Sequence, residues 1–311
     1  MPETIQYRPR LIEQLITNER LGKYKTVFKT TNDIELLGVY LWNIHVGSAI
    51  YPLTCAAEVT LRNSIDYVLT RRIGYFWWSQ DKKGKKLKYK SFNPQTLSEP
   101  DSVRKLKENF QKAYDSRART KPPIQKHYSF IAKTDFSTWE YILDNEFMGD
   151  VPKTGGGSEP LIWTAKHLKE VFTGTWPSLS AHTTLNYAKN LVSTIRKFRN
   201  RISHNEPVWK KFGVDTEVDA IKHLHEKIEK IEKLINLIDP EKFKLLEKSG
   251  FFKAAYRACS SEEIRRFQHL AQTHSINSID DLKGLVTMQS NSTLKAQIGN
   301  EGITQYFLIV T

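Results

Sequence analysis

The chain has 311 residues, of which 39% are hydrophobic and 26% are charged, as in a soluble globular protein with one or two domains. No segment reaches the roughly 18 to 20 uninterrupted apolar residues of a membrane span, and the N-terminal sequence MPETIQYRPRLIEQ lacks the apolar core of a secretory signal. We therefore expect a cytoplasmic protein in which Cys55 and Cys259 are free thiols. The formal net charge of +13 favours polyanionic partners, because excess positive charge attracts them at long range.

The first third of the chain predicts a pair of helices after an N-terminal extension (residues 1–30). Aliphatic and alanine-rich sequence indicates helices at about 33–49 and about 52–72, with Pro52 at a position where a helix can begin. Residues 80–100 are polar, rich in lysine and interrupted by glycine and proline, so we expect a loop there.

The middle of the chain continues as shorter helices. A basic helix is expected at about 101–115, and a short helix with aromatic anchors at about 134–147. The run Gly155-Gly156-Gly157-Ser158-Glu159-Pro160 predicts a flexible joint. It is not a phosphate loop, because no Lys-Ser or Lys-Thr pair follows it. The helical pattern resumes at about 161–173 and at about 182–203.

The last long helix has the clearest pattern. From Thr216 to Ile238, apolar residues recur at three- and four-residue steps with Glu and Lys between them, and Pro240 ends the helix. Residues 241–311 are expected to form a small C-terminal appendage of unknown role, ending in a strand at Tyr306–Val310. The sequence therefore predicts an all-α protein with little sheet.

The most informative segment is Arg199-Asn200-Arg201-Ile202-Ser203-His204, at the end of the helix predicted at 182–203. A guanidinium binds phosphate oxygens in a planar fork, and an imidazole titrates near neutral pH. Cleavage of a phosphodiester without a metal needs both functions, so Arg199, Asn200 and His204 are candidate site residues. No carboxylate cluster or paired-histidine motif accompanies them, so no metal and no cofactor are expected.

Helical periodicity places the motif on one side of its helix. The apolar residues at helical spacing are Leu191, Ile195, Phe198 and Ile202. At about 100° per residue, Asn200 and His204 lie nearly opposite this stripe and share one face. The alternative is that His204 only caps the helix C-terminus, where a cation is favourable, and that Arg199 pairs with a carboxylate.

Two blocks of sequence are informative in combination. One runs from Leu41-Trp42-Asn43 through Tyr51-Pro52-Leu53 to Glu58-Val59-Thr60-Leu61-Arg62-Asn63, followed by Gly74 and Trp77-Trp78. The other comprises Leu161-Ile162-Trp163, Phe172, Leu185-Asn186-Tyr187 and the segment from Arg199 to Pro207. Over roughly residues 30 to 240 they resemble the Abi-like family of bacterial abortive-infection proteins, of the AbiD and AbiF type. That family is grouped with the HEPN ribonucleases, whose signature is an arginine, about four to six residues and a histidine, often with an asparagine after the arginine.

The resemblance implies an all-α, HEPN-like helical bundle at residues 31–240, with a basic insertion at about 80–125 and the appendage at 241–311. It also implies a metal-independent endoribonuclease toxin that cleaves RNA through Arg199, Asn200 and His204. HEPN sites are usually composite, built where two such motifs meet. Many relatives are toxins of toxin–antitoxin systems, held by a protein or by a small RNA.

Chemistry independently favours a composite site. When a 2′-OH attacks the adjacent phosphorus, one group removes a proton while another protonates the leaving 5′-oxygen, and a single imidazole cannot do both at once. The chain contains one Arg-x4-His motif, so we expect a homodimer, because closed two-fold dimers bring the same patch of both subunits together. Arg199 would then neutralise the charge that develops on the phosphorane oxygens.

Further basic residues are candidates for RNA contacts. The densest run includes Lys82, Lys83, Lys85 and Lys86, which could equally form a solvated loop. Arg62 and Asn63 either reach RNA or belong to a structural salt bridge with Glu58, four residues before Arg62. Trp77 and Trp78 either stack on bases or anchor the core. The predicted RNA-binding residues are Arg62, Asn63, Lys82, Lys83, Lys85, Lys86, Arg196 and Arg201.

Two other functions remain open from the sequence. A non-catalytic protein could use the same basic surface to hold a structured small RNA. An interaction scaffold would explain the long amphipathic helix but would leave the positive charge without a role.

Overall fold

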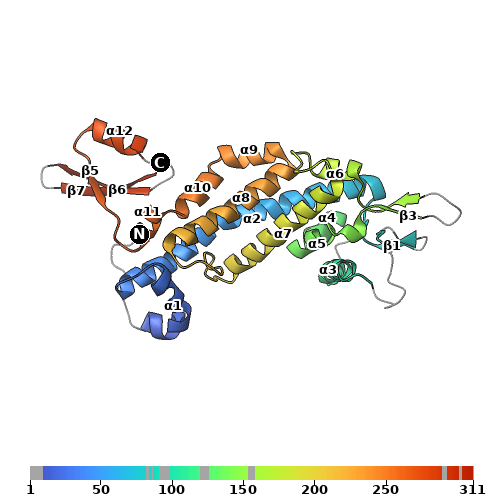
Figure 1. Cartoon of the computed structure of the whole chain (residues 1–311), viewed down its shortest axis with the longest axis horizontal. Coiled ribbons are helices and arrows are strands. Elements are labelled where there is room, and N and C mark those ends of the chain that lie inside the picture. Colours follow the sequence, from blue (N-terminus) through green and yellow to red (C-terminus); the bar gives the residue numbers. More distant parts are fainter. Residues whose placement is uncertain are drawn as a thin grey trace. The chain divides into compact units, whose positions relative to one another are not determined.

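The computed structural model describes residues 10–81, 84–85, 87–90, 99–119, 126–152, 158–288, 293–300 and 303–310. Most of these residues are helical, which confirms the predicted all-α class, and α2, α7 and α8 are the long helices in Figure 1. The helices are η1 (Leu11–Ile16), α1 (Asn18–Val27), α2 (Asp33–Ile73), α3 (Asp101–Ala118), α4 (His127–Ile131), α5 (Phe136–Tyr141), η2 (Asn145–Phe147), α6 (Ala165–Val171), α7 (Ala181–Ser203), α8 (Glu217–Ile238), α9 (Pro240–Lys248), α10 (Phe251–Ala258), α11 (Ser261–Phe267) and α12 (Ile279–Met288). None of the helices within the described ranges combines the length and the apolar composition that a membrane span requires.

The strands are few and form small sheets. The hairpins are β1 (Gln80–Asp81) with β2 (Gly84–Lys85) and β3 (Asp150–Pro152) with β4 (Ser158–Pro160), both antiparallel. Near the C-terminus, β6 (Thr293–Asn300) lies between β5 (Thr273–Ser275), which is parallel to it, and β7 (Ile303–Val310), which is antiparallel. The predicted C-terminal strand is confirmed as the end of β7. Of the joint predicted at Gly155–Pro160, residues 155–157 lie outside the described residues, whereas Ser158–Pro160 form strand β4 and not a flexible joint.

Helix α2 has Pro52 in its interior, so the predicted break between two helices at this position is wrong. Proline has no N–H to donate to the carbonyl of Ser48, four residues earlier, and costs about 3 kcal/mol inside a helix. Ile50 and Leu53, on either side of it, are fully buried. Their tertiary packing offsets the lost hydrogen bond and keeps the helix continuous.

The other predicted helices are present, but the residues at which they begin and end differ from the prediction. α3, α7 and α8 begin and end within a few residues of the predicted bounds. The helix predicted at 134–147 is divided into α5 and η2, and the one predicted at 161–173 is shortened to α6. α8 stops at Ile238, and Pro240 opens α9, where the missing N–H has no cost because the first turn of a helix has no partners for its N–H groups.

The described residues divide into two compact units whose boundaries differ from the predicted domains. The first unit contains the described residues of 1–53, 198–229 and 246–311. The second unit contains those of 54–197 and 230–245. Helices α2, α7 and α8 each contribute residues to both units, so the predicted 31–240 domain is shared between them.

In the first unit, the N-terminal segment is part of the core and not an extension of it. Tyr24, on α1, is fully buried, and its ring centroid lies 5.0 Å from that of Trp209. The ring of Phe28 lies 5.3 Å from Trp42 and 5.0 Å from Trp209. These edge-to-face contacts fasten α1 to α2 and to the segment that follows the Arg199–His204 motif.

The first unit also includes the helices α10 and α11, so the prediction that residues 241–311 form a separate appendage is wrong for its helical part. The indole Nε1 of Trp42 donates a hydrogen bond to the carbonyl of Ala258, at 2.8 Å. Gly38 packs so closely that a Cβ at this position would lie 2.3 Å from the carbonyl oxygen of Phe267. Helix α2 therefore packs directly against α10 and α11.

The second unit has an aromatic core. Trp77, Trp139 and Trp163 are fully buried. Trp78 stacks on Phe110 with a centroid distance of 4.4 Å and nearly parallel rings. Trp77 and Trp78 thus anchor the core, which confirms the structural alternative for this pair. Neither ring could stack with a nucleobase on both of its faces.

Candidate functional site

The predicted motif lies at the C-terminal end of α7. The backbone N–H groups that close this end donate in the pattern of a Schellman cap, Asn205 to the carbonyl of Ile202 and Glu206 to the carbonyl of Arg201, both at 2.9 Å. Asn205 has a φ of 50°, a left-handed conformation that asparagine tolerates better than most residues. The cap fixes the backbone of His204, the residue between the helix and Asn205.

Asn43 holds the turn that follows the motif. Its Nδ2 donates to the carbonyl of Glu206, at 3.2 Å, and its Oδ1 accepts from the N–H of Val208, at 2.9 Å. Asn43 is 1% exposed, so both bonds are shielded from water. The two sequence blocks of the resemblance therefore meet directly through this side chain, and α2 positions the end of the motif.

The three arginines at the end of α7 have different environments. The Nε of Arg196 donates to the carboxylate of Glu140, at 2.6 Å. The guanidinium of Arg201 donates to Glu206, at 3.2 Å, and to the carbonyls of Lys210, at 2.6 Å, and Pro207. Both are engaged within the protein, so their predicted role in RNA binding is accompanied by a clear structural role.

Arg199 differs from its two neighbours. Its Nε is buried and has no hydrogen-bond partner within the described ranges of the chain. No carboxylate there pairs with its guanidinium, so the ion pair considered as an alternative is absent from that part of the protein. A buried guanidinium nitrogen without a partner is costly, which makes Arg199 a candidate for an external anion.

The side chains of Asn200 and His204 face away from the core, as predicted. Leu191, Ile195 and Phe198 are buried, whereas Asn200 is half-buried and His204 is exposed. Neither of the two polar side chains makes a hydrogen bond to another residue in the described segments. The imidazole of His204 bonds none of the last helix carbonyls there, so the alternative role as a cap would rest only on the interaction of a cation with the helix C-terminus.

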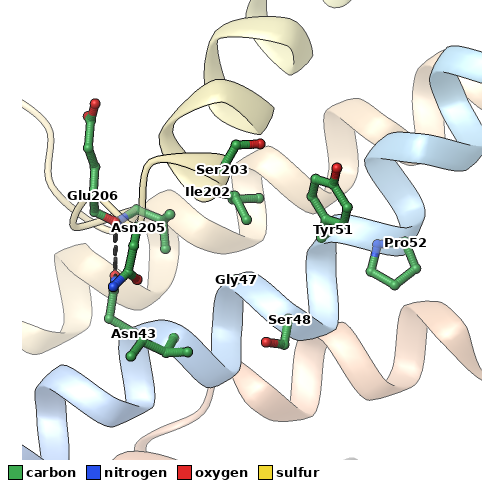
Figure 2. Close-up of a pocket in the computed structure, with 11 residues that line it drawn as sticks. Asn43, Gly47, Ser48, Tyr51, Pro52, Ile202, Ser203, Asn205 and Glu206 are labelled. Atoms are coloured by element: carbon green, nitrogen blue, oxygen red, sulfur yellow. Dashed lines mark hydrogen bonds between the residues drawn. The ribbon is translucent and has the colours of Figure 1, made fainter.

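A pocket of about 610 Å³ lies beside the end of the motif (Figure 2). The close-up shows α2 on one side, with Gly47, Ser48 and Tyr51, and the end of α7 on the other, with Ser203 and Asn205. His204 is not among the lining residues, although its two sequence neighbours are. Ser48 is one of the lining residues. Its backbone carbonyl lacks the usual hydrogen bond from four residues later, because Pro52 has no N–H to donate.

Gly47 allows α2 and α7 to approach at this pocket. A Cβ on Gly47 would lie 3.3 Å from the Cγ2 of Ile202, tighter than an ordinary contact. Ile202, the last member of the predicted stripe, is half-buried and lines the pocket instead of the core.

The other histidines of this part of the first unit do not supply a second imidazole. Burial, with a smaller contribution from nearby Lys227, Lys211 and Arg201, lowers the pKa of His223 to about 4. His223 is therefore neutral at pH 7 and enclosed in the unit. His225 bonds the carbonyl of Cys259 through Nε2, at 3.1 Å.

The remaining predicted RNA contacts lie elsewhere or outside the described residues. Lys82, Lys83 and Lys86 lie outside them, and of Lys85 only the backbone is described, as part of β2. Arg62 and Asn63 belong to the second unit, where Asn63 is exposed and accepts a long hydrogen bond from Arg62, at 3.4 Å. Glu58 and Arg62, the two members of the salt bridge considered as the alternative, are both half-buried.

Sequence reasoning missed Asn43 as a positioning residue. The available signal was a single amide on an otherwise apolar stretch of α2, because a buried amide must find partners. Within the described residues, no three His, Cys, Asp or Glu side chains gather as the ligands of a metal ion would.

Comparison with known proteins identifies the family. The sequence profile described as "Abi-like protein" matches residues 10–210, from η1 to the turn that Asn43 holds. Comparisons with curated proteins and with solved structures gave no match. The matched region covers more than half of the chain and contains both Asn43 and the complete Arg199–His204 motif, so the chain belongs to the Abi-like protein family.

Proposed function

We infer that the protein acts in abortive infection, the function that its membership of the Abi-like family suggests. We propose that the protein is a metal-independent endoribonuclease, a toxin of a bacterial abortive-infection or toxin–antitoxin system, and that Arg199, Asn200 and His204 cleave the RNA. HEPN-type chemistry is the mechanism that these residue types support best.

One observation carries the proposal. At the end of α7, Arg196 and Arg201 are tied to groups of the protein, whereas Arg199, Asn200 and His204 have no side-chain partner in the described structure. The Schellman cap and the Asn43 bonds hold the backbone of this trio in place. A rigid backbone that presents unpartnered binding groups is the property expected of a preorganised site.

The reaction that fits these groups is an internal transfer within the RNA. The 2′-oxygen forms a bond to the adjacent phosphorus, and the bond from phosphorus to the 5′-oxygen breaks. One imidazole takes the proton of the 2′-hydroxyl, and an imidazolium donates a proton to the departing 5′-oxygen. Arg199 binds the phosphate oxygens, and Asn200 orients the phosphate or the imidazole. The products are a 2′,3′-cyclic phosphate and a 5′-hydroxyl.

The second imidazole comes from a second copy of the chain. His204 is exposed, and His223 and His225 are engaged or enclosed inside the protein. A two-fold dimer would bring a second His204 to the same phosphate and exclude water from it. The pocket between α2 and α7, of about 610 Å³, is large enough to hold a nucleoside beside the phosphate.

The rival function is a non-catalytic protein that holds a structured small RNA. Its support is that, in the described structure, the motif at the end of α7 contains a single imidazole, that of His204, which cannot serve as both acid and base. Growth after induced expression, followed by gel analysis of total RNA, separates the two. The proposed enzyme arrests growth and fragments RNA, and His204→Ala abolishes both.

A matched control is His182→Ala, which removes an exposed histidine at the opposite end of α7. It should behave as the wild type. Growth arrest without RNA fragments in the wild type, or fragments that persist in His204→Ala, would contradict the assignment.

The dimer is tested by mixing subunits. Excess His204→Ala protein, added to wild type and allowed to exchange, should reduce the activity per wild-type subunit, because mixed dimers carry one imidazole. Activity that depends only on the wild-type concentration would show that the site is not shared.

A further inference from the structure

A second pocket, of about 770 Å³, lies in the second unit and is lined by three exposed tyrosines. They come from separate segments: Tyr67 from α2, Tyr75 from the turn after α2, and Tyr128 from α4. Their exposed fractions are 62%, 67% and 65%. Large rings that converge on one hollow and remain open to solvent are unusual in a surface that has no binding role. We call this hollow the tyrosine pocket.

Two cations accompany these rings. The guanidinium carbon of Arg71 lies 5.3 Å from the ring centroid of Tyr67, and the Nζ of Lys126 lies 6.0 Å from that of Tyr128. Both cations line the pocket and both are exposed. Tyr67 and Tyr128 therefore each have a positive charge beside an aromatic ring.

Asp66 is the one carboxylate among the described lining residues, and it accepts hydrogen bonds within the protein. The Nε1 of Trp77 donates to Asp66 Oδ1, at 2.8 Å, and His127 Nε2 lies 2.9 Å from the same oxygen. Because His127 Nδ1 accepts from the N–H of Phe76, at 3.0 Å, the proton of a neutral His127 is on Nε2 and is donated to Asp66. Asp66 stays negative, but these donors hold its carboxylate, and the two lining cations Arg71 and Lys126 outnumber it.

The same contacts make the pocket rigid. His127 joins α4 to α2 through Asp66 and to the turn after α2 through Phe76. Its ring lies 5.2 Å from that of Tyr75, and it directly precedes Tyr128 in the chain. The buried His127 thus sets the spacing of tyrosines that come from three segments, and it has no ring nitrogen left for catalysis.

We infer that the tyrosine pocket binds single-stranded RNA, with bases stacked on Tyr67, Tyr75 and Tyr128 and phosphates bound by Arg71 and Lys126. Aromatic platforms combined with cations that follow the backbone are how single strands are bound without a fixed sequence. Asn63, also in the lining, can hydrogen-bond the edge of a stacked base. The ligand class rests on the proposed function, whereas the stacking chemistry rests on the pocket alone.

The chain's net charge of +13 favours this occupant over a protein segment. Stacking and phosphate binding are shared by RNA and single-stranded DNA, so the source of the strand has to be tested. In a duplex the faces of the bases are stacked on one another, so the tyrosines should add little to the affinity for a duplex.

The test uses full-length protein with His204→Ala, so that RNA is not cut and binding is measured even if the protein is no ribonuclease. Fluorescence anisotropy gives the affinity for oligouridylate, oligothymidylate and an RNA duplex of equal length. Tyr67→Ala and Tyr128→Ala should each weaken oligouridylate binding roughly 5- to 100-fold, and Tyr67→Phe should preserve it. Arg71→Gln and Lys126→Gln should each reduce the log–log salt slope by about 0.7.

Tyr306→Ala is the matched control, because Tyr306 is 54% exposed and has Lys295 Nζ 5.0 Å from its ring, outside the pocket. It should leave the affinity unchanged. Unchanged oligouridylate affinity in folded Tyr67→Ala and Tyr128→Ala would overturn the inference, as would an equal loss on the duplex. Oligothymidylate bound more tightly than oligouridylate would overturn the assignment to RNA.

Discussion

The side chain of Asn43 accepts a hydrogen bond from the backbone N–H of Val208 and donates another to the carbonyl of Glu206, across 165 and 163 positions of sequence. Through this one amide, α2 sets the place where α7 ends and where His204 is presented. The candidate site is therefore maintained by a residue that takes no part in the proposed chemistry.

Asn43→Ala should reduce both stability and RNA cleavage. It deletes two shielded hydrogen bonds and leaves the buried N–H of Val208 without its partner, at a cost of about 2 to 3 kcal/mol in the free energy of unfolding. Urea unfolding measures this, with Asn190→Ala, an exposed change on α7, as the control. A variant as stable and as active as the wild type would show that the turn is held by other contacts.

Substitution of Arg199 should mainly reduce RNA cleavage, whereas substitution of Arg201 should mainly reduce stability. Arg201→Ala removes bonds to the carbonyls of Lys210 and Pro207 and should lower the free energy of unfolding by about 1 to 3 kcal/mol. Arg199→Ala should change stability by less than about 1 kcal/mol, since no hydrogen bond of its side chain is lost in the described structure, yet reduce cleavage at least about 100-fold. Equal losses of cleavage in the two variants, after correction for the unfolded fraction, would remove the distinction drawn between them.

Gly38→Ala should destabilise the first unit. The added Cβ would lie 2.3 Å from the carbonyl oxygen of Phe267, so backbone must move, at a cost of about 1 to 3 kcal/mol. Gly22→Ala is the matched control, because a Cβ there meets nothing within 4 Å and alanine favours a helix by up to about 1 kcal/mol. Thermal melting of both variants compares them directly. If Gly38→Ala melts no lower than Gly22→Ala, α11 does not pack against α2 as described.

Glu263 should make the stability depend on acid pH. Burial raises the pKa of its carboxyl, but hydrogen bonds from His45, at 3.0 Å, and from Arg266 outweigh burial and hold the pKa at about 2. Because the folded-state pKa lies below the usual 4.5, this stabilisation is complete above about pH 4.5 and is lost as the pH falls towards 2. The amount is about 3 kcal/mol.

The measurement for Glu263 is the free energy of unfolding against pH, compared with Glu263→Gln. The difference between the two proteins should shrink as the pH falls from about 4.5 to about 2. A difference that stays constant over this window would show that the carboxyl is not held in its charged form.

The parts of the fold that follow from local periodicity were predictable. The three- and four-residue steps of α8 and the stripe of Leu191, Ile195 and Phe198 on α7 depend only on the helix repeat, and burial confirms them. The same repeat gave the outward direction of Asn200 and His204.

Features that depend on distant partners were not predictable from the sequence. In the sequence, Pro52 indicates the start of a helix. The burial of Ile50 and Leu53, which the sequence does not show, explains why α2 continues through this proline. Tyr24 and Gly38 become parts of the core through Trp209 and Phe267, which lie far along the chain. The hydrogen bonds of Arg201, and the lack of a partner for Arg199 among the described residues, are likewise set by the fold and not by their spacing.

The central claim is that Arg199 and His204 cleave RNA without a metal. The most direct measurement incubates purified wild-type protein with end-labelled single-stranded RNA in excess EDTA, beside His204→Ala and His182→Ala, and identifies the new ends. We predict cleavage by the wild type and by His182→Ala, with 2′,3′-cyclic phosphate and 5′-hydroxyl ends, and none by His204→Ala. Cleavage that requires added Mg²⁺ or Mn²⁺, or that His204→Ala retains, would contradict the account.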